Sequence, residues 1–347
     1  MDGYGRLVNE DDSRRPKSPH ARVAWSLSAL GVDATSVRSR ALILSRDVML
    51  SAGLPARLWQ GLARYLRVAQ EEFDLLPLHF VPEEQTSLSI DLSSRQVNDL
   101  CVASKLLYAH IRWLDSLVDD QQEAVDPQEI HGLNNALGKL INTTLGDALS
   151  GQASTSLFAT LSELYGSYAL SSALDSAAAP DRLEEPITVE SYASHAKART
   201  APMRAPVDAV LMVSSADQNL VNAAREAFES CMIAIQFYDD CLDVEEDFAA
   251  QRGSWLVRRI VSERKRIACL AGKAGTSSAP TADDFYAGAL RDGHIDEALA
   301  TSLQYFGAAR STSEQVFPGW ARIQSKLIQR VQSLRNEYRN VVAYHDK

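Results

Sequence analysis

The chain has 347 residues, of which 46% are apolar, and a formal net charge of −10. This length allows a large buried core, and an acidic chain without a basic stripe is not typical of a nucleic-acid-binding protein. No stretch approaches the ~18 uninterrupted apolar residues of a transmembrane helix. The polar start, "MDGYGRLVNEDDSRRPKSPHARV", lacks the apolar segment of a signal peptide. Four scattered cysteines without a CxxC pair are typical of a reduced protein, so we expect a cytoplasmic location.

Taken in chain order, the sequence begins with a polar, charged segment at residues 1–18, which predicts a disordered tail. Residues 19–347 then show helical periodicity almost throughout, and runs of alternating β-branched residues are nearly absent. The pattern predicts about ten helices, over residues 34–51, 55–73, 93–122, 128–147, 153–173, 188–213, 215–248, 254–271, 284–308 and 318–344. No linker divides this region, so we predict a single all-α domain.

One predicted helix ends in an acidic segment, "LDSLVDD", residues 114–120. Asp115 and Asp119 are four residues apart and share one helix face. The preceding turns of the same face carry Ile111, Tyr108 and Ser104. This helix therefore combines a mostly apolar body with an acidic end.

A second predicted helix ends in the same way, with "IQFYDDCLDVEED" at residues 235–247. Asp239, Asp243 and Asp247 follow one another at intervals of four and form a stripe of carboxylates. Phe228, Met232 and Ile235 precede them. The two acidic helix ends are thus alike, although about 120 residues separate them.

Carboxylates spaced in this way repel one another, at about 0.2–0.5 kcal/mol per pair. An acidic turn is most often solvated surface, but apolar neighbours on the same faces indicate that these clusters point inward, where carboxylates need cations. Oxygen ligands alone suit Mg²⁺, often completed by the phosphates of a substrate. The EF-hand pattern with its central glycine is absent, and so is a glycine-rich phosphate loop. The sequence therefore predicts two facing acid clusters that hold Mg²⁺ and a diphosphate.

These motifs resemble those of the class I isoprenoid synthase superfamily. "DSLVD", residues 115–119, is similar to the first DDxxD motif, with Ser116 in its second position. "FYDDCLDVEED", residues 237–247, resembles the second aspartate motif of prenyl diphosphate synthases. "YASHAKARTAP", residues 192–202, resembles the segment that carries a Lys or Arg in contact with diphosphate. The resemblance covers about residues 90–260.

The resemblance implies a helical fold around a central cavity, and an Mg²⁺-dependent enzyme with three metal ions held with the diphosphate. It implies catalytic roles for Asp115, Asp119, Asp239 and Arg199. The metal ligands that it implies are Asp115, Asp119, Asp120, Asp239, Asp240, Asp243 and Asp247. The groups that it implies for substrate binding are Arg199, its alternative Lys197, Arg252, and the apolar-face residues Tyr108, Phe228 and Met232. The implied substrate is a C15 to C25 prenyl diphosphate, and a homodimer is compatible with the fold.

Two departures from the chain-elongating synthases bear on the reaction. Residues 34–75 contain no GGK segment, and "QQEAVDP" follows Asp120 where an arginine pair is expected. Because both features bind an acceptor diphosphate in that family, the sequence favours a class I terpene synthase that cyclises or hydrates one substrate. A prenyltransferase, either a prenyl diphosphate synthase or the squalene/phytoene type, stays an alternative. The other alternative is a non-catalytic subunit, which Ser116 favours and the retained aspartates oppose.

Overall fold

The computed structural model of the chain describes residues 32–81, 93–119, 126–149, 152–176, 185, 187–214, 216–270 and 281–345. Every regular element in these ranges is helical, which confirms the predicted all-α class. The predicted tail at residues 1–18 lies outside the described residues. None of the described helices is both long enough and apolar enough to pass through a membrane.

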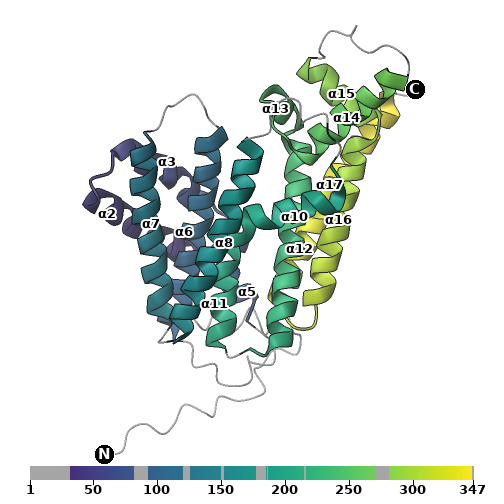
Figure 1. The fold of residues 1–347 in the computed structure, drawn as a ribbon. Helices are drawn as coiled ribbons and strands as arrows, with labels where there is room; N and C mark the ends of the chain where they lie inside the picture. The colour runs from purple at the N-terminus through teal and green to yellow at the C-terminus, as the bar shows by residue number, and fades with distance from the viewer. Residues whose placement is uncertain are drawn as a thin grey trace, which may run out of the picture.

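The N-terminal half is built around one long helix, α6. Its members are α2 (Ala34–Ser51), α3 (Ala56–Arg67), α6 (Ser94–Asp119), α7 (Pro127–Ala148) and α8 (Gln152–Ser176). Helices α2, α3 and α7 all pack against α6, and Figure 1 shows them together on one side of the molecule.

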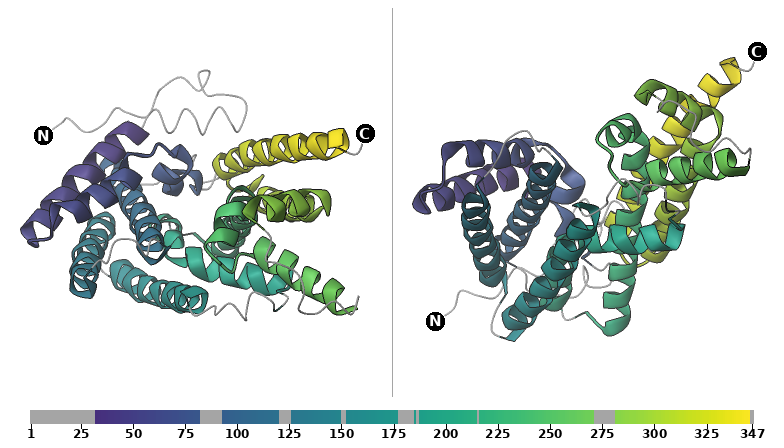
Figure 2. Two further views of the ribbon diagram at one scale, coloured as in Figure 1. Left: turned by 90° about the horizontal axis from the view of Figure 1, so that it is seen from above. Right: turned by 45° about the horizontal axis from the view of Figure 1, so that its top comes forward.

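The C-terminal half has α12 as its inner helix. Its members are α12 (Gln218–Leu242), α13 (Val244–Ala249), α14 (Trp255–Leu270), α15 (Ala282–Arg291), α16 (His294–Ser313) and α17 (Pro318–His345). Helix α16 packs along α12 and α17 packs along α16. Seen from above in Figure 2, this half lies beside the N-terminal half, with α17 on the far side from α7.

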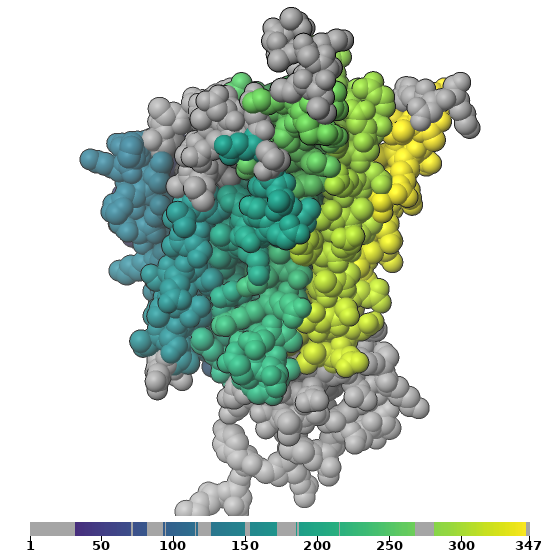
Figure 3. Space-filling view, turned by 45° about the vertical axis from the view of Figure 1, so that its right-hand side comes forward, coloured from purple at the N-terminus to yellow at the C-terminus, as the bar shows by residue number. Residues whose placement is uncertain are grey.

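Short elements join the two halves. They are α4 (Glu71–Asp74), α5 (Leu76–His79), α10 (Val189–Thr200), the 3-10 helix η3 (Ala201–Arg204) and α11 (Ala205–Val213). Helix α5 contacts α6, α11 and α17, and α10 contacts both α8 and α12. On the face shown in Figure 3, the colours pass without a break from the helices of the first half to those of the second.

Four predicted helices are interrupted in the structure. The predicted helix 55–73 stops after Arg67, and helix resumes only at α4, Glu71–Asp74. The predicted helix 188–213 is divided by η3 at Pro202, because proline has no N–H to donate within a helix. The predicted helix 284–308 is divided at Gly293, whose φ of 82° is readily adopted by glycine alone. The predicted helix 215–248 breaks at Asp243, where α12 ends and α13 begins. The short helices that result, together with α5, explain why the described residues form more helices than predicted.

Local sequence signals explain where the two inner helices begin. At the start of α6, the Ser93 hydroxyl accepts from the N–H of Gln96 at 3.2 Å, and the Gln96 side chain accepts from the N–H of Ser93 at 3.0 Å. This reciprocal pair is a capping box. At the start of α12, the Asp217 carboxylate accepts from the N–H of Leu220 at 2.9 Å. Both helices then run through the core to their acidic ends.

An aromatic cluster closes the interior at the end away from the acidic segments. Phe80, just after α5, lies 4.9 Å from Trp320 of α17, 5.4 Å from Phe317 and 6.4 Å from Phe228 of α12, measured between ring centroids. The indole N–H of Trp320 also donates to the Ala227 carbonyl at 3.4 Å. These rings are all buried, so they fasten the end of α5 to the C-terminal half.

Candidate metal and diphosphate site

The first acidic segment ends helix α6. Asp115 and Asp119 lie in the last turns of this helix, but their side chains and the whole of Asp120 lie outside the described part of the structure. Below them, Ser104, Tyr108 and Ile111 are buried, as the apolar face predicted. The Ser116 hydroxyl donates to the carbonyl of Trp113 at 2.8 Å, so this serine is bonded to its own helix.

The second acidic segment spans the end of α12 and the short helix α13. Asp239 lies in the last turn of α12, Asp243 at the junction and Asp247 within α13. The N–H of Asp243 donates to the Asp239 carbonyl at 2.9 Å, and the N–H of Asp247 donates to the Asp243 carbonyl at 2.7 Å. The helical spacing therefore continues across the junction, and the three carboxylates stay one turn apart.

Charged groups near the end of α6 and at the end of α12 influence one another. Burial raises the pKa of Asp239 and of Asp243, and the positive charge of Arg112, on α6, offsets part of each rise. In the other direction, the charge of Asp239 adds to burial in raising the pKa of the Tyr108 phenol, also on α6. Arg112 lies one turn before Asp115 on the same helix, so this coupling favours the predicted site between the two acidic ends, which stays a prediction.

The carboxylates of α12 and α13 are held in an environment that disfavours their ionised form. Burial, together with the charges of Asp243 and Asp247, raises the pKa of Asp239 to about 6. Desolvation also raises the pKa of Asp243 and of Asp247, and each has another carboxylate nearby that adds to the rise. A divalent cation would relieve both the desolvation and the repulsion.

Two of the predicted basic residues lie beside these carboxylates. The charge of Arg199, at the end of α10, offsets part of the rise that burial causes in the pKa of Asp239. The guanidinium of Arg252, in the segment between α13 and α14, lies 3.0 Å from a carboxylate oxygen of Glu246 and 3.5 Å from one of Asp247. The residue before it, Gln251, has a left-handed backbone with a φ of 57°. The backbone N–H of Arg252 donates to the Asp247 carbonyl at 2.8 Å.

The alternative basic residue, Lys197, is engaged elsewhere. Its ammonium group lies 2.7 Å from a carboxylate oxygen of Glu229, which also pairs with Arg204 at 2.7 Å. Glu229 lies ten residues before Asp239 in α12, which is about 15 Å along a helix. Of the two predicted residues in this segment, Arg199 is therefore the one beside the acid cluster.

Asp240 differs from its neighbours in its contacts. One carboxylate oxygen accepts from the Tyr192 hydroxyl at 2.7 Å, and the other accepts from the backbone N–H of Trp255 at 2.9 Å. Burial raises the pKa of Asp240 to about 8, and the charges of Asp247 and Asp239 add to the rise. This predicted metal ligand is bonded to α10 and to the start of α14.

The apolar residues predicted to contact the prenyl chain lie in the packed interior. Tyr108 stacks on Phe73 with 5.2 Å between ring centroids, and Phe228 belongs to the aromatic cluster around Trp320. Met232 is buried one turn above Phe228 on α12. All three are buried, and their contact with substrate stays a prediction.

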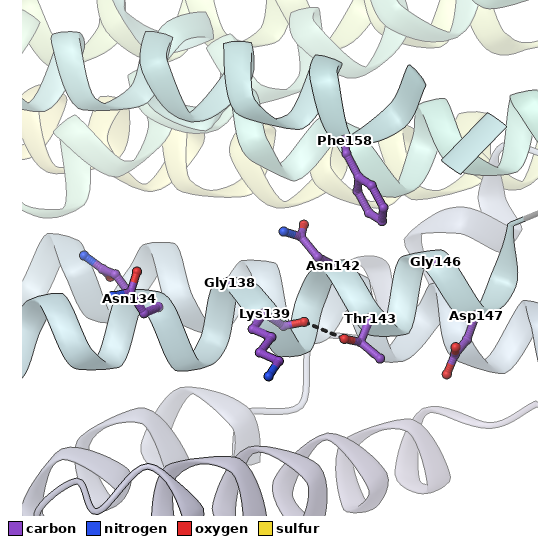
Figure 4. Close-up of a pocket in the computed structure, with 9 residues that line it drawn as sticks. Asn134, Gly138, Lys139, Asn142, Thr143, Gly146, Asp147 and Phe158 are labelled. Atoms are coloured by element: carbon purple, nitrogen blue, oxygen red, sulfur yellow. Dashed lines mark hydrogen bonds between the residues drawn. The ribbon is translucent and has the colours of Figure 1, made fainter. Parts of the chain in front are cut away.

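Two surface hollows of about 630 Å³ each lie away from the acid clusters. One lies between α7 and α8, where Asn142 and Phe158 point toward one another, as Figure 4 shows. The other lies along α10 and α12, around the Lys197 and Glu229 pair. Neither is lined by an aspartate of the two motifs, so we do not place the reaction in them.

The described side chains do not form a complete metal site. Among them, no three His, Cys, Asp or Glu groups gather closely enough to hold an ion by themselves. The carboxylates of Asp115 and Asp119 are not among these side chains. The donor set of α12 and α13 nevertheless fits a hard divalent cation, because it consists of oxygen atoms whose mutual repulsion a cation would offset.

Two residues of this region were not foreseen from the sequence. Arg112 lies three residues before Asp115, and a basic residue so close to an acidic helix end is a signal that could have been noticed. Tyr192 lies seven residues before Arg199 on α10, a spacing that puts both on one helix face. Its bond to Asp240 depends on how α10 packs against α12, which the sequence does not reveal.

Comparison with known proteins supports the fold. No protein-family model matches the chain, and no curated protein is similar to it in sequence. Among solved structures, the geranylgeranyl pyrophosphate synthetase from the archaeon Geoglobus acetivorans is similar, with a TM-score of 0.58 and 14% sequence identity. The match covers 85% of this chain and 98% of that one. The chain therefore has the isoprenoid synthase fold, as the motifs predicted.

Proposed function

We propose that the protein is an Mg²⁺-dependent enzyme that ionises an allylic prenyl diphosphate between the acidic ends of α6 and α12. The observation that carries the proposal is the coupling of Arg112 and Tyr108, on α6, to Asp239 on α12. This coupling supports a site in which Asp115 and Asp119, on the same helix as Arg112, would act together with the carboxylates of α12. The similarity of the fold to a geranylgeranyl pyrophosphate synthetase supports the same reaction class.

The proposed roles follow from the chemistry of each group. Asp115, Asp119, Asp239, Asp243 and Asp247 would hold the metal through their oxygens. Bound Mg²⁺ would stabilise the negative charge on the departing diphosphate. Arg199, Arg252 and Arg112 would bind the diphosphate oxygens and hold them against the cluster, since arginine forms paired hydrogen bonds with phosphate.

Two reactions of the resulting carbocation are open to this site. Transfer to a second prenyl substrate is the one that the structural neighbour favours, since its name describes a prenyl diphosphate synthetase. Cyclisation or hydration of a single substrate is favoured by the missing GGK segment and the missing arginine pair. We give first place to prenyl transfer.

The α3 helix offers basic groups that could receive an acceptor diphosphate. Gly61 lies against Trp113, two residues before Asp115, so α3 adjoins the acidic end of α6. Arg57 is paired with Glu129 of α7. Arg64 is exposed, and Arg67 lies over the Trp59 ring, with 5.6 Å from its guanidinium carbon to the ring centroid. Arg64 and Arg67 are therefore better placed than Arg57 to bind an anion.

One incubation series tests the function. The full chain is incubated with C10, C15, C20 and C25 diphosphates and Mg²⁺, with and without labelled isopentenyl diphosphate, and products are identified by mass. Label in a longer allylic diphosphate would establish prenyl transfer, and a hydrocarbon or alcohol formed without acceptor would establish the cyclase. Condensation of two allylic molecules would indicate the squalene/phytoene type. No diphosphate release from any substrate would contradict an enzyme and favour the non-catalytic subunit.

A further inference from the structure

Asp240 bonds to both of the segments that carry the proposed diphosphate-binding arginines. Its first carboxylate oxygen accepts from Tyr192 on α10 at 2.7 Å, and Arg199 lies at the end of α10. Its second carboxylate oxygen accepts from the N–H of Trp255 at 2.9 Å, three residues after Arg252. One side chain of α12 therefore connects the metal-binding helix to both basic segments.

The Tyr192 contact is well placed to set the position of Arg199. The two residues are seven apart on α10 and share a helix face. The Tyr192 ring is buried and lies edge-on to Phe237 of α12, with 5.0 Å between ring centroids. Phe237 in turn packs edge-on to Trp255, at 5.3 Å. The hydrogen bonds of Asp240 thus lie within a rigid aromatic contact between α10, α12 and the start of α14.

The orientation of Asp240 separates it from the metal-binding stripe. Asp239 and Asp243 are four residues apart and share a face, whereas adjacent residues on a helix do not face the same way. Asp240 is only 6% exposed, and both of its oxygens already accept a hydrogen bond from the protein. These two hydrogen bonds occupy one lone pair on each oxygen and hold the carboxylate against α10 and the start of α14, rather than on the face that Asp239 and Asp243 share.

We infer that Asp240 and Tyr192 are positioning residues, which hold Arg199 and Arg252 beside Asp239 so that they can meet a metal-bound diphosphate, and that Asp240 is not a metal ligand. The inference rests on the proposed function, because it assumes that a diphosphate binds there. It assigns the paired aspartates of "FYDDCLD" different tasks: Asp239 binds metal, and Asp240 fixes the surrounding basic groups.

Conservative variants separate the two tasks. Asp240→Asn is nearly isosteric and can keep both contacts, because its amide oxygen can accept from the Trp255 N–H while its NH₂ group donates to the Tyr192 oxygen. Asp239→Asn removes a charged metal ligand at the adjacent position. Tyr192→Phe removes only the hydroxyl that Asp240 binds. The matched control is Tyr165→Phe, which removes a hydroxyl that contacts a His110 ring nitrogen at 3.1 Å, outside the proposed site.

The test is calorimetric titration of the full-length protein and each variant with Mg²⁺ and inorganic diphosphate, with the melting temperature measured alongside. Asp240→Asn should bind Mg²⁺ and diphosphate within ~3-fold of the wild type, and Asp239→Asn should bind more than ~10-fold less tightly. Tyr192→Phe should weaken diphosphate binding ~5- to 30-fold at saturating Mg²⁺, while Tyr165→Phe leaves it unchanged.

Each other outcome has a defined meaning. If Asp240→Asn loses as much affinity as Asp239→Asn, Asp240 is a ligand and the positioning role is wrong. If Tyr192→Phe lowers the melting temperature but leaves diphosphate binding unchanged, the contact is merely structural and the inference is again wrong. If the wild type itself fails to bind diphosphate with Mg²⁺, the proposed function is wrong and the positioning role falls with it.

Discussion

The charge of Arg112 on α6 acts on Asp239 at the end of α12, although 127 positions in the sequence separate them. A cation at this position reduces the repulsion among Asp239, Asp243 and Asp247 when no metal is bound. It is also suitably placed to contact a diphosphate once the metal binds. Arg112 therefore connects the stability of the site to its proposed chemistry.

Replacement of Arg112 by Ala should raise the pKa of Asp239 above its value of about 6, because a nearby positive charge that favours the ionised carboxylate is lost. The acidic limb of the pH–activity profile should therefore move to higher pH, and kcat/KM should fall ~10- to 100-fold. The profile is measured by diphosphate release between pH 5 and pH 9.

The control for this variant is Arg310→Ala, which removes an exposed arginine whose described partner is Glu314, the residue just after the end of its own helix. It should leave the profile unchanged. An Arg112→Ala profile that coincides with the wild-type profile would show that Arg112 does not act on the carboxylates during the reaction.

Replacement of Asp239 by Asn should reduce turnover at least ~100-fold, since the proposed metal ligand and its charge are lost. Without Mg²⁺, however, the melting temperature should stay level or rise, because one of several repelling carboxylates becomes neutral. Turnover is measured with a prenyl diphosphate, and melting by circular dichroism. Asp47→Asn, at an exposed site on α2, is the matched control for the change of charge. A marked drop in the melting temperature of Asp239→Asn would indicate a structural role instead.

The stability of the metal-free protein should fall as pH rises from about 5 to 8. The pKa values of Asp239 and Asp240 are raised to about 6 and about 8 in the folded state, whereas the unfolded chain titrates near its ordinary value of about 3.9. Between those limits the folded state binds more protons than the unfolded state, so deprotonation favours unfolding. Midpoints of urea unfolding at fixed pH values measure the trend.

Mg²⁺ with diphosphate should reverse this trend, because metal binding requires ionised carboxylates and so strengthens as they lose their protons. The stabilisation by Mg²⁺ and diphosphate should therefore be larger at pH 8 than at pH 5.5. Stabilisation that is equal at both values would show that these carboxylates do not bind the metal.

The sequence allowed the fold class and most helix boundaries to be predicted, because apolar periodicity and capping are local. The predicted helix over residues 34–51 matches α2, and the predicted helix 128–147 is within one residue of α7 at each end. The breaks at Pro202 and Gly293 were also present in the sequence, but helical patterns on both sides concealed them. Helix α5, residues 76–79, fell within a segment that was predicted to interrupt the helices.

The candidate site was predictable only in part, for a physical reason. The spacing of Asp239, Asp243 and Asp247 is a property of one helix and its continuation, so it follows from the sequence. The different contacts of Arg199 and Lys197, and of Asp239 and Asp240, depend on which neighbouring helix each side chain meets. That information lies in the packing of α10, α12 and α14, which is set by contacts between distant residues such as Tyr192 and Phe237.

The close approach of α3 to α6 gives a last prediction, at Gly61. A Cβ atom there would lie 2.6 Å from the Trp113 indole nitrogen, so Gly61→Ala must push α3 or the Trp113 ring aside. Overpacking of this kind costs about 1–3 kcal/mol of the free energy of unfolding. Because Trp113 is two residues before Asp115, activity should fall further than the lost stability explains, even well below the melting temperature.

The control is Gly166→Ala on α8, where an added Cβ meets nothing within 4 Å. This change should instead add about 0.5–1 kcal/mol to the free energy of unfolding. Chemical unfolding and diphosphate release at 20–25 °C measure the two effects, and full activity in a destabilised Gly61→Ala protein would show that the α3 contact does not position the acidic end of α6.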